Sequence, residues 1–225
     1  MLALQFGTAV LAQQVWYPKH SLEYVIQKPL VLIASQLVLY FVVGGCMIIF
    51  LEGKYHVPFW RSIHWNWPSG FGLFLLLGAA TMMGLGMLEA FLPVPKDTPF
   101  EHLFDNPLDA YLLSIIAVTF APLLEEVFFR GLLYPVLARR MGIAGGVFFS
   151  ALPFGLIHLQ QYGWAWSAGL VIFLVGVVCG IVRARTNSLA ASVLVHTGYN
   201  GTQMLISIVV THGFRHMDKV GALLH

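Results

Sequence analysis

The sequence predicts an all-α protein, a polytopic bundle of about six transmembrane helices. Hydrophobic residues make up 58% of the 225 residues, charged residues only 10%, and the mean hydropathy is +0.79, which excludes an ordinary soluble domain. A helix needs about 20 apolar residues to cross a bilayer. Six segments approach or exceed that length: 30–51, 71–92, 110–137, 145–159, 165–182 and 188–210. We therefore expect an integral, multi-pass membrane protein.

Four stretches of different character follow one another along the chain. Residues 1–28 are apolar but lack the early Lys or Arg of a signal peptide, so we expect an interfacial segment. Residues 29–107 comprise two accessory spans and an acidic, proline-rich loop. Residues 108–211 form a core of four spans that carry polar side chains, and 212–225 form a polar tail. Within that core we expect Pro122 to bend the helix of 110–137, and His158 to shorten the apolar run of 145–159.

The few basic residues gather in the connections on one side of a six-span arrangement, and the positive-inside rule makes that side cytoplasmic. In a prokaryotic cell the membrane would then be the plasma (inner) membrane. No basic run resembles a nucleic-acid-binding arm, so the bilayer is an expected partner and nucleic acid is not. The opposite connections hold only Lys96. The basic residues of the cytoplasmic side are Lys54, Arg61, Arg139, Arg140, Arg183 and Arg185.

Glu125 and Glu126 are the most unusual residues, because the stretch from 111 to 137 is otherwise free of charge except for Arg130. A charge at the bilayer centre is costly, so such residues face a protein interior or a water-filled cavity. Glu126 and Arg130 are four residues apart on one helix face, which predicts an ion pair. Glu125 lies about 100° further around and is expected to stay unpaired. The alternative is a purely structural ion pair with a spare Glu.

Three more polar residues lie in expected spans. His158 follows Phe154 by one helical turn, close to a membrane interface, where a lone His is commonly an ordinary interfacial residue. His196 and Asn200 share one helix face deep in the last span, which costs stability unless they meet other polar groups. We expect these three side chains and Glu125 to converge on one polar cavity.

Such a set of groups can hydrolyse an amide. A carboxylate and an imidazole can polarise a water for attack on a peptide carbonyl, while a second imidazole and a carboxamide donate hydrogen bonds to the developing oxyanion. The sequence contains no Gly-x-Ser-x-Gly nucleophile and no thiol in a cationic setting. An activated water is therefore the expected nucleophile.

The stretches APLLEEVFFRGLLYPVL, FGLIH and HTGYN resemble the CPBP family of intramembrane proteases. This family is also known as the Abi or CAAX amino-terminal proteases and includes the type II CAAX prenyl endopeptidases. Its three signatures are Glu-Glu-x-x-x-Arg, Phe-x-x-x-His and His-x-x-x-Asn/Asp/Ser, each on its own transmembrane helix. All three occur here in that order, within residues 110–210, although this chain has fewer expected spans than many family members.

The resemblance implies an intramembrane endopeptidase with a catalytic core at 108–211, acting on CAAX-type prenylated peptides or on small hydrophobic peptides. Carried over by motif position, Glu125 would be the catalytic base and His158 its partner in activating water. His196 and Asn200 would stabilise the oxyanion.

A zinc site is the open alternative, because Glu125, His158 and His196 are the ligands of a His₂Glu centre. The sequence has no His-Glu-x-x-His helix. If Glu125 bound zinc, only Glu126 would remain as a base, and its spacing favours pairing with Arg130. The sequence thus favours a mechanism without a metal cofactor, in which Glu126 and Arg130 support the reacting groups.

Two other functions remain as alternatives. A proton-coupled membrane transporter would use the same acids and histidines as a relay, but the internal repeats typical of many transporters are absent from the sequence. A catalytically silent immunity or binding protein would keep the scaffold without turnover, and the intact set of polar residues argues against it.

Overall fold

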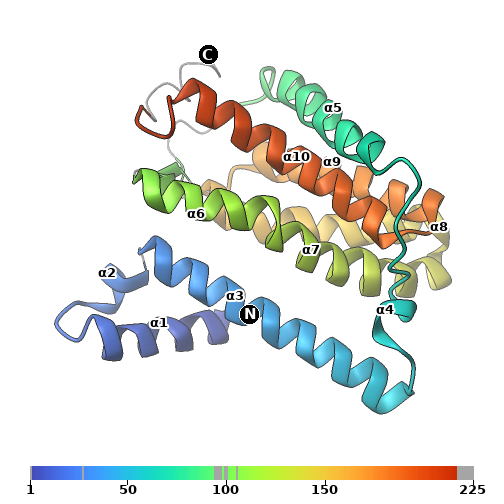
Figure 1. Ribbon diagram of the computed structural model, residues 1–225, viewed down its shortest axis with the longest axis horizontal. Helices are drawn as coiled ribbons and strands as arrows, with labels where there is room; N and C mark the ends of the chain where they lie inside the picture. The colour runs from blue at the N-terminus through green and yellow to red at the C-terminus, as the bar shows by residue number, and fades with distance from the viewer. Residues whose placement is uncertain (1, 27, 94–97, 99–100, 105, 217–225) are drawn as a thin grey trace. The chain divides into compact units, whose positions relative to one another are not determined.

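The computed structural model describes residues 2–26, 28–93, 98, 101–104 and 106–216, and this part of the chain is helical without any strand (Figure 1). The expected all-α class is confirmed. Lys96 and residues 217–225 of the expected tail lie outside the described residues. Four segments are long and apolar enough to cross a membrane: Pro29–Lys54, Phe71–Glu89, Pro107–Tyr162 and Trp166–Thr186. The protein is therefore an integral membrane protein.

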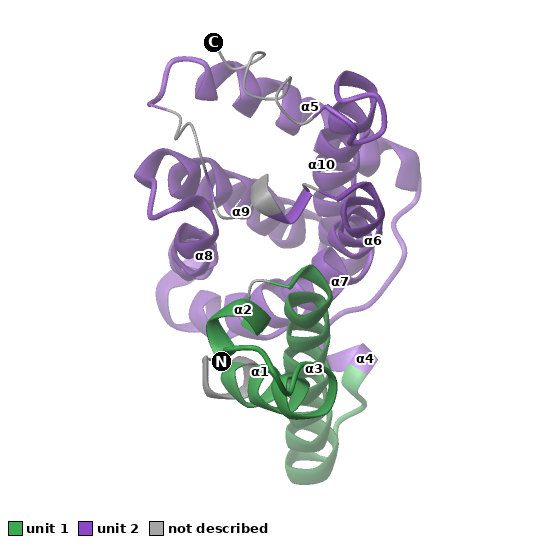
Figure 2. Cartoon of the chain, turned by 90° about the vertical axis from the view of Figure 1, so that its left-hand side faces the viewer, with its two compact units in different colours: residues 1–59 green, residues 60–225 purple. Residues whose placement is uncertain are grey.

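The chain divides into two compact units, residues 1–59 and 60–225 (Figure 2). In the first unit α1 (Leu2–Trp16) and α2 (Leu22–Ile26) pack against α3 (Pro29–Ile48), which continues as a π-helix over Ile49–Lys54. Pro29 suits the first turn of α3, where its missing N–H has no intrahelical partner to lose. A small cluster joins the three helices: Ala9, Ala12, Val25 and Val31.

The second unit holds the helices with polar residues. After the short α4 (Phe59–Ser62) at the junction, its elements are α5 (Phe71–Glu89), α6 (Pro107–Val118), α7 (Phe120–Glu126), α8 (Tyr134–His158), α9 (Trp166–Thr186) and α10 (Leu189–Val210). Here α10 packs against α5, α6, α7 and α9, and α8 packs against α9. The expected accessory span 71–92 thus forms α5 and belongs to this unit, because it packs along α10.

The expected segment 110–137 is interrupted where the proline predicts. Thr119, with φ −114° and ψ −72°, separates α6 from α7. Pro122 has no N–H and its ring clashes with the carbonyl four residues earlier, so the helix bends just before it. A π-helix, Val127–Leu133, follows α7, and such wide turns are frequent at functional sites. Gly142, at φ 75°, then kinks α8, so that the expected span 145–159 is its second half.

The last expected span forms α10, which begins where the Ser188 hydroxyl accepts a hydrogen bond from the Ala191 backbone N–H at 3.0 Å. The polar residues of α10 lower its hydropathy, so it is not one of the four apolar segments given above. They are accommodated because α10 packs among other helices. Val175 and Cys179 of α9 meet Val195 of α10 in a buried cluster.

Arg183 departs from the expectation. The six-span reading places it in a connection, whereas the structure places it in the last turn of α9 with only 3% of its surface exposed. The helix runs further than the apolar stretch, because Asn187, in the left-handed conformation at φ 50°, ends it only after Thr186.

Gly78 of α5 and Gly198 of α10 allow these two helices to touch backbone to backbone. A Cβ at Gly78 would overlap the carbonyl oxygen of Val195, and a Cβ at Gly198 would overlap that of Leu75. Small residues commonly permit such close approach in membranes. The contact fixes α10, and with it His196, against the bundle.

The substitution Gly198→Ala is expected to lower the free energy of unfolding by about 1–3 kcal/mol, because the helices must separate to admit the new methyl group. Reversible unfolding in mixed micelles measures this. Gly201→Ala is the control on the same helix, since a Cβ there meets only the Val118 side chain at 3.6 Å, an ordinary contact. Equal losses in both variants would contradict the tight contact.

Candidate functional site

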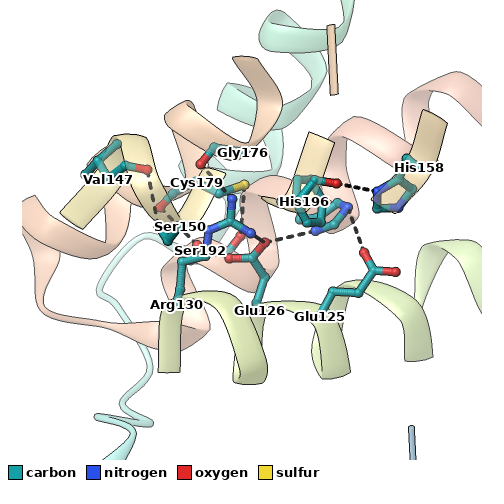
Figure 3. A network of polar contacts seen from close by, with 11 residues as sticks. Glu125, Glu126, Arg130, Val147, Ser150, His158, Gly176, Cys179, Ser192 and His196 are labelled. Atoms are coloured by element: carbon teal, nitrogen blue, oxygen red, sulfur yellow. Dashed lines mark hydrogen bonds and ion pairs between the residues drawn. The ribbon is translucent and has the colours of Figure 1, made fainter. Parts of the chain in front are cut away.

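Glu126 is the centre of a buried polar network (Figure 3). Its side chain is fully buried. Its Oε1 accepts hydrogen bonds from Arg130 Nη1 at 2.7 Å and from His196 Nδ1 at 3.1 Å, and its Oε2 accepts one from the Ser192 hydroxyl at 2.6 Å. A buried carboxylate is tolerated when it is paired and hydrogen-bonded in this way. The predicted ion pair between Glu126 and Arg130 is confirmed.

Arg130, the partner of Glu126 in the ion pair, is also buried and hydrogen-bonded. Its side chain is fully buried, and Nη2 donates a hydrogen bond to the Gly176 carbonyl of α9 at 2.6 Å. The guanidinium carbon lies 4.7 Å from the centre of the Phe154 ring, a favourable cation–π contact. A Cβ on Gly176 would come within 3.0 Å of Nη2, so the glycine makes room for this contact. The ion pair thereby joins α7, α8 and α9.

His196 faces both acids. A carboxylate can only accept hydrogen bonds, so Nδ1 carries the proton that is donated to Glu126. This fixes the orientation of the ring, and Nε2 then lies 3.9 Å from Glu125 Oε2. The expectation that Glu125 has no partner is corrected, because the neighbouring position on α7 also turns toward α10. Glu125 is 14% exposed while Glu126 is sealed, so Glu125 is the accessible acid.

His158 adjoins this network through Phe154. Its Nδ1 lies 2.6 Å from the Phe154 carbonyl oxygen and donates to it, which leaves Nε2 as the acceptor of a neutral ring. The Phe154 ring lies edge-on to both imidazoles, with centroids 4.9 Å from His158 and 5.6 Å from His196. The two histidines therefore flank one phenyl ring.

Asn200 lies one turn beyond His196 on α10. Its Nδ2 donates a hydrogen bond to the Ala117 carbonyl oxygen at 2.7 Å, near the break between α6 and α7. Within the described ranges Asn200 makes no hydrogen bond with the other predicted site residues. The structure therefore brings together four of the predicted residues: Glu125, Glu126, Arg130 and His196. His158 lies beside them across the Phe154 ring, and Asn200 is hydrogen-bonded to α6 instead.

Ser192 and Gly176 complete the network without having been predicted as site residues. Ser192 stands four residues before His196 on α10, so it shares the face of that histidine, a spacing that identifies it as a candidate. Gly176 is the first residue of a Gly-x-x-x-Gly pair, whose packing role gives no sign of the carbonyl that it offers to Arg130.

Three of the residues gathered here could ligate a metal ion. Among the described residues, the ligand atoms that lie within 4.8 Å of one another belong to Glu126, Cys179 and His196, and not to Glu125, His158 and His196, the ligands of the alternative zinc site. Glu126 already accepts a hydrogen bond from the Arg130 guanidinium, so a cation bound there would stand beside another cation. Arg130 would therefore compete with a metal ion at Glu126.

Comparison with known proteins shows which family part of the chain resembles. Residues 107–202 match the family model described as type II CAAX prenyl endopeptidase Rce1-like. The chain is 30% identical over 122 residues to an uncharacterized 24.3 kDa protein of Escherichia coli, which covers 52% of this chain and 55% of that protein. It thus spans about half the length of this relative, and no solved structure matches it. The matched region contains the whole network, so the residues of the candidate site lie in the part of the chain that is similar to the Rce1-like CAAX proteases.

Proposed function

We propose that this protein is an intramembrane endopeptidase that hydrolyses a peptide bond with a water activated by Glu125 and His158. The observation that carries the proposal is that the two adjacent acids differ in burial and in ion pairing. Glu126 is sealed and neutralised by Arg130, whereas Glu125 is accessible and faces an imidazole whose orientation Glu126 fixes. Divided roles of this kind are typical of a hydrolytic site.

In the proposed reaction the water oxygen bonds to the carbonyl carbon while one water proton passes to Glu125. The free Nε2 of His158 accepts the second hydrogen bond of this water, because its Nδ1 proton is donated to the Phe154 carbonyl. When the C–N bond breaks, Glu125 returns the proton to the departing amine nitrogen. The reaction therefore starts and ends with the same protonation of Glu125.

The proposed oxyanion donors come from α10. When both ring nitrogens of His196 carry protons, Nδ1 donates to Glu126 and Nε2 is the donor beside Glu125. An amide nitrogen carries two protons, so Asn200 keeps one after binding the Ala117 carbonyl. Donors held in place before the reaction stabilise the transition state without further reorganisation.

The proposed substrate is a CAAX-type prenylated peptide or a small hydrophobic peptide delivered from the bilayer. The experiment uses the full chain in liposomes with a farnesylated CAAX peptide, its unprenylated twin and a pH-sensitive dye in the lumen. Mass spectrometry is expected to detect hydrolysis at one peptide bond. Solute-coupled proton uptake without cleavage would favour a transporter, and binding without cleavage would favour a silent scaffold. Either result would contradict the proposal.

Peptide hydrolysis is expected to survive removal of metal ions, because Glu125 and His158 supply the base and Arg130 competes with any cation at Glu126. The measurement compares rates before and after treatment with a membrane-permeant chelator, alongside metal analysis of the purified protein. Loss of activity that zinc restores, together with one bound metal ion per chain, would assign Glu125, His158 and His196 as ligands instead.

A further inference from the structure

A hollow of about 260 Å³ lies between the first half of α8 and the end of α9. Besides Pro135, Ala138 and Ala184, its lining consists of basic and hydrogen-bonding side chains, and none of the described residues that line it is acidic. Since α9 is long and apolar enough to span a membrane and ends at Thr186, the hollow lies at the end of this candidate span. The polar residues of its lining are His64, Tyr134, Arg139, Arg183 and Asn187.

Arg183 is the key residue of the hollow. It is 3% exposed, and Nη1 donates to Asn187 Oδ1 at 2.9 Å, but its buried Nε has no hydrogen-bond partner. Among the described residues no carboxylate forms an ion pair with it. A buried guanidinium with an unused donor and no counter-ion is costly, and an anion in the hollow would remove that cost.

Two further basic groups face the same hollow. Arg139 reaches it from α8, and His64 reaches it from the connection before α5. Burial, together with the positive charge of Arg183, lowers the pKa of His64, so the charge of Arg183 acts on this part of the connection. Three nitrogen-bearing side chains from three elements thus surround one space.

An apolar groove of about 500 Å³ continues along the same contact between α8 and α9, beyond the kink at Gly142. Ala184 lines both the hollow and the groove, so the two border the same residue. Arg185 also lines the groove, and its other lining residues are Ile143, Ala144, Val147, Phe148, Val177 and Ile181. A hollow lined by cationic side chains beside an apolar groove has the chemistry of a phospholipid site.

We propose that the hollow binds the phosphate of an anionic phospholipid through Arg183 and Arg139, with one acyl chain lying in the groove. Basic pockets between transmembrane helices bind anionic headgroups by the same principle. A free phosphate would satisfy Arg183 but leave the groove unused, whereas a lipid fills both. The site shares no residue with the proposed catalytic network, so it stands independently of the proposed function.

Native mass spectrometry of the full chain in detergent, with added dioleoyl phosphatidylglycerol, tests the proposal. Dioleoylglycerol, which lacks the phosphate, and inorganic phosphate, which lacks the chains, are the two comparison probes. The fraction of protein with bound phosphatidylglycerol is expected to be well above the fraction with either comparison probe bound. Binding of dioleoylglycerol at the same level would show annular lipid contact only, and equally tight inorganic phosphate would show a free-anion site. Either outcome overturns the assignment of a phospholipid.

Arg183→Gln and Arg139→Gln are each expected to weaken phosphatidylglycerol binding about tenfold or more, because each removes a charge-assisted hydrogen bond. Arg140→Gln is the matched control, since Arg140 is exposed on the next position of α8 and does not line the hollow. Arg139→Gln alone decides the question if Arg183→Gln fails to fold. Unchanged binding in Arg139→Gln, or an equal loss in Arg140→Gln, would overturn the site.

Discussion

Replacing Glu125 by Gln is expected to reduce the single-turnover rate of peptide cleavage by about 10³-fold or more, because the amide cannot accept the proton of the attacking water. The side chain keeps its size, and Glu126, Arg130 and Ser192 keep their contacts. The folded fraction should therefore stay unchanged. The measurement is single-turnover cleavage of the farnesylated peptide in liposomes, with thermal unfolding of the same preparation.

Glu89→Gln is the matched control for this change. Glu89 is a partly buried acid at the end of α5, so the same chemical change is made on another helix of the same unit. It should leave the cleavage rate unaffected. A Glu125→Gln protein that cleaves at the rate of the unmodified chain would remove Glu125 from the chemistry.

Replacing Arg130 by Ala is expected to lower the free energy of unfolding by about 3–5 kcal/mol, because it leaves Glu126 charged and buried without its cation. The same change also removes the hydrogen bond to the Gly176 carbonyl and the contact with the Phe154 ring. The protein should be poorly folded rather than merely slow. Unfolding in mixed micelles measures the loss.

Two further variants show whether the stability lost in Arg130→Ala comes from the unpaired charge of Glu126. Arg140→Ala removes an exposed cation of α8 and is expected to change stability little. Combining Arg130→Met with Glu126→Gln removes both charges and should recover part of the stability, since an uncompensated charge is the main cost. Normal stability with lost activity in Arg130→Ala would show instead that Arg130 acts on the substrate.

The helices and the ion pair were predictable because they depend on local spacing. Apolar segment length predicts the long helices, Pro122 predicts the bend near Thr119, and the spacing of four predicts the pair of Glu126 and Arg130. The bond from His158 to the Phe154 carbonyl likewise stays within one helical turn. Each of these features is determined by residues close together in the sequence.

Contacts between helices were not predictable in this way. The bond between His196 and Glu126 joins residues 70 positions apart, and it depends on how α10 packs on α7. The approach of Glu125 to His196 depends on the same packing of α10 on α7. Arg183 was expected in a connection, because its charge marks the end of the apolar run, while the helix and its burial continue past that point.

The central claim is that Glu125 and His158 activate one water together, as a single catalytic unit. A double-mutant cycle with Glu125→Gln and His158→Gln, measured as single-turnover cleavage of the farnesylated peptide, tests it most directly. Residues that act as a unit are strongly non-additive, so the double variant is predicted to cleave about as slowly as the Glu125→Gln variant alone. A double variant whose loss equals the product of the two separate losses would contradict the claim.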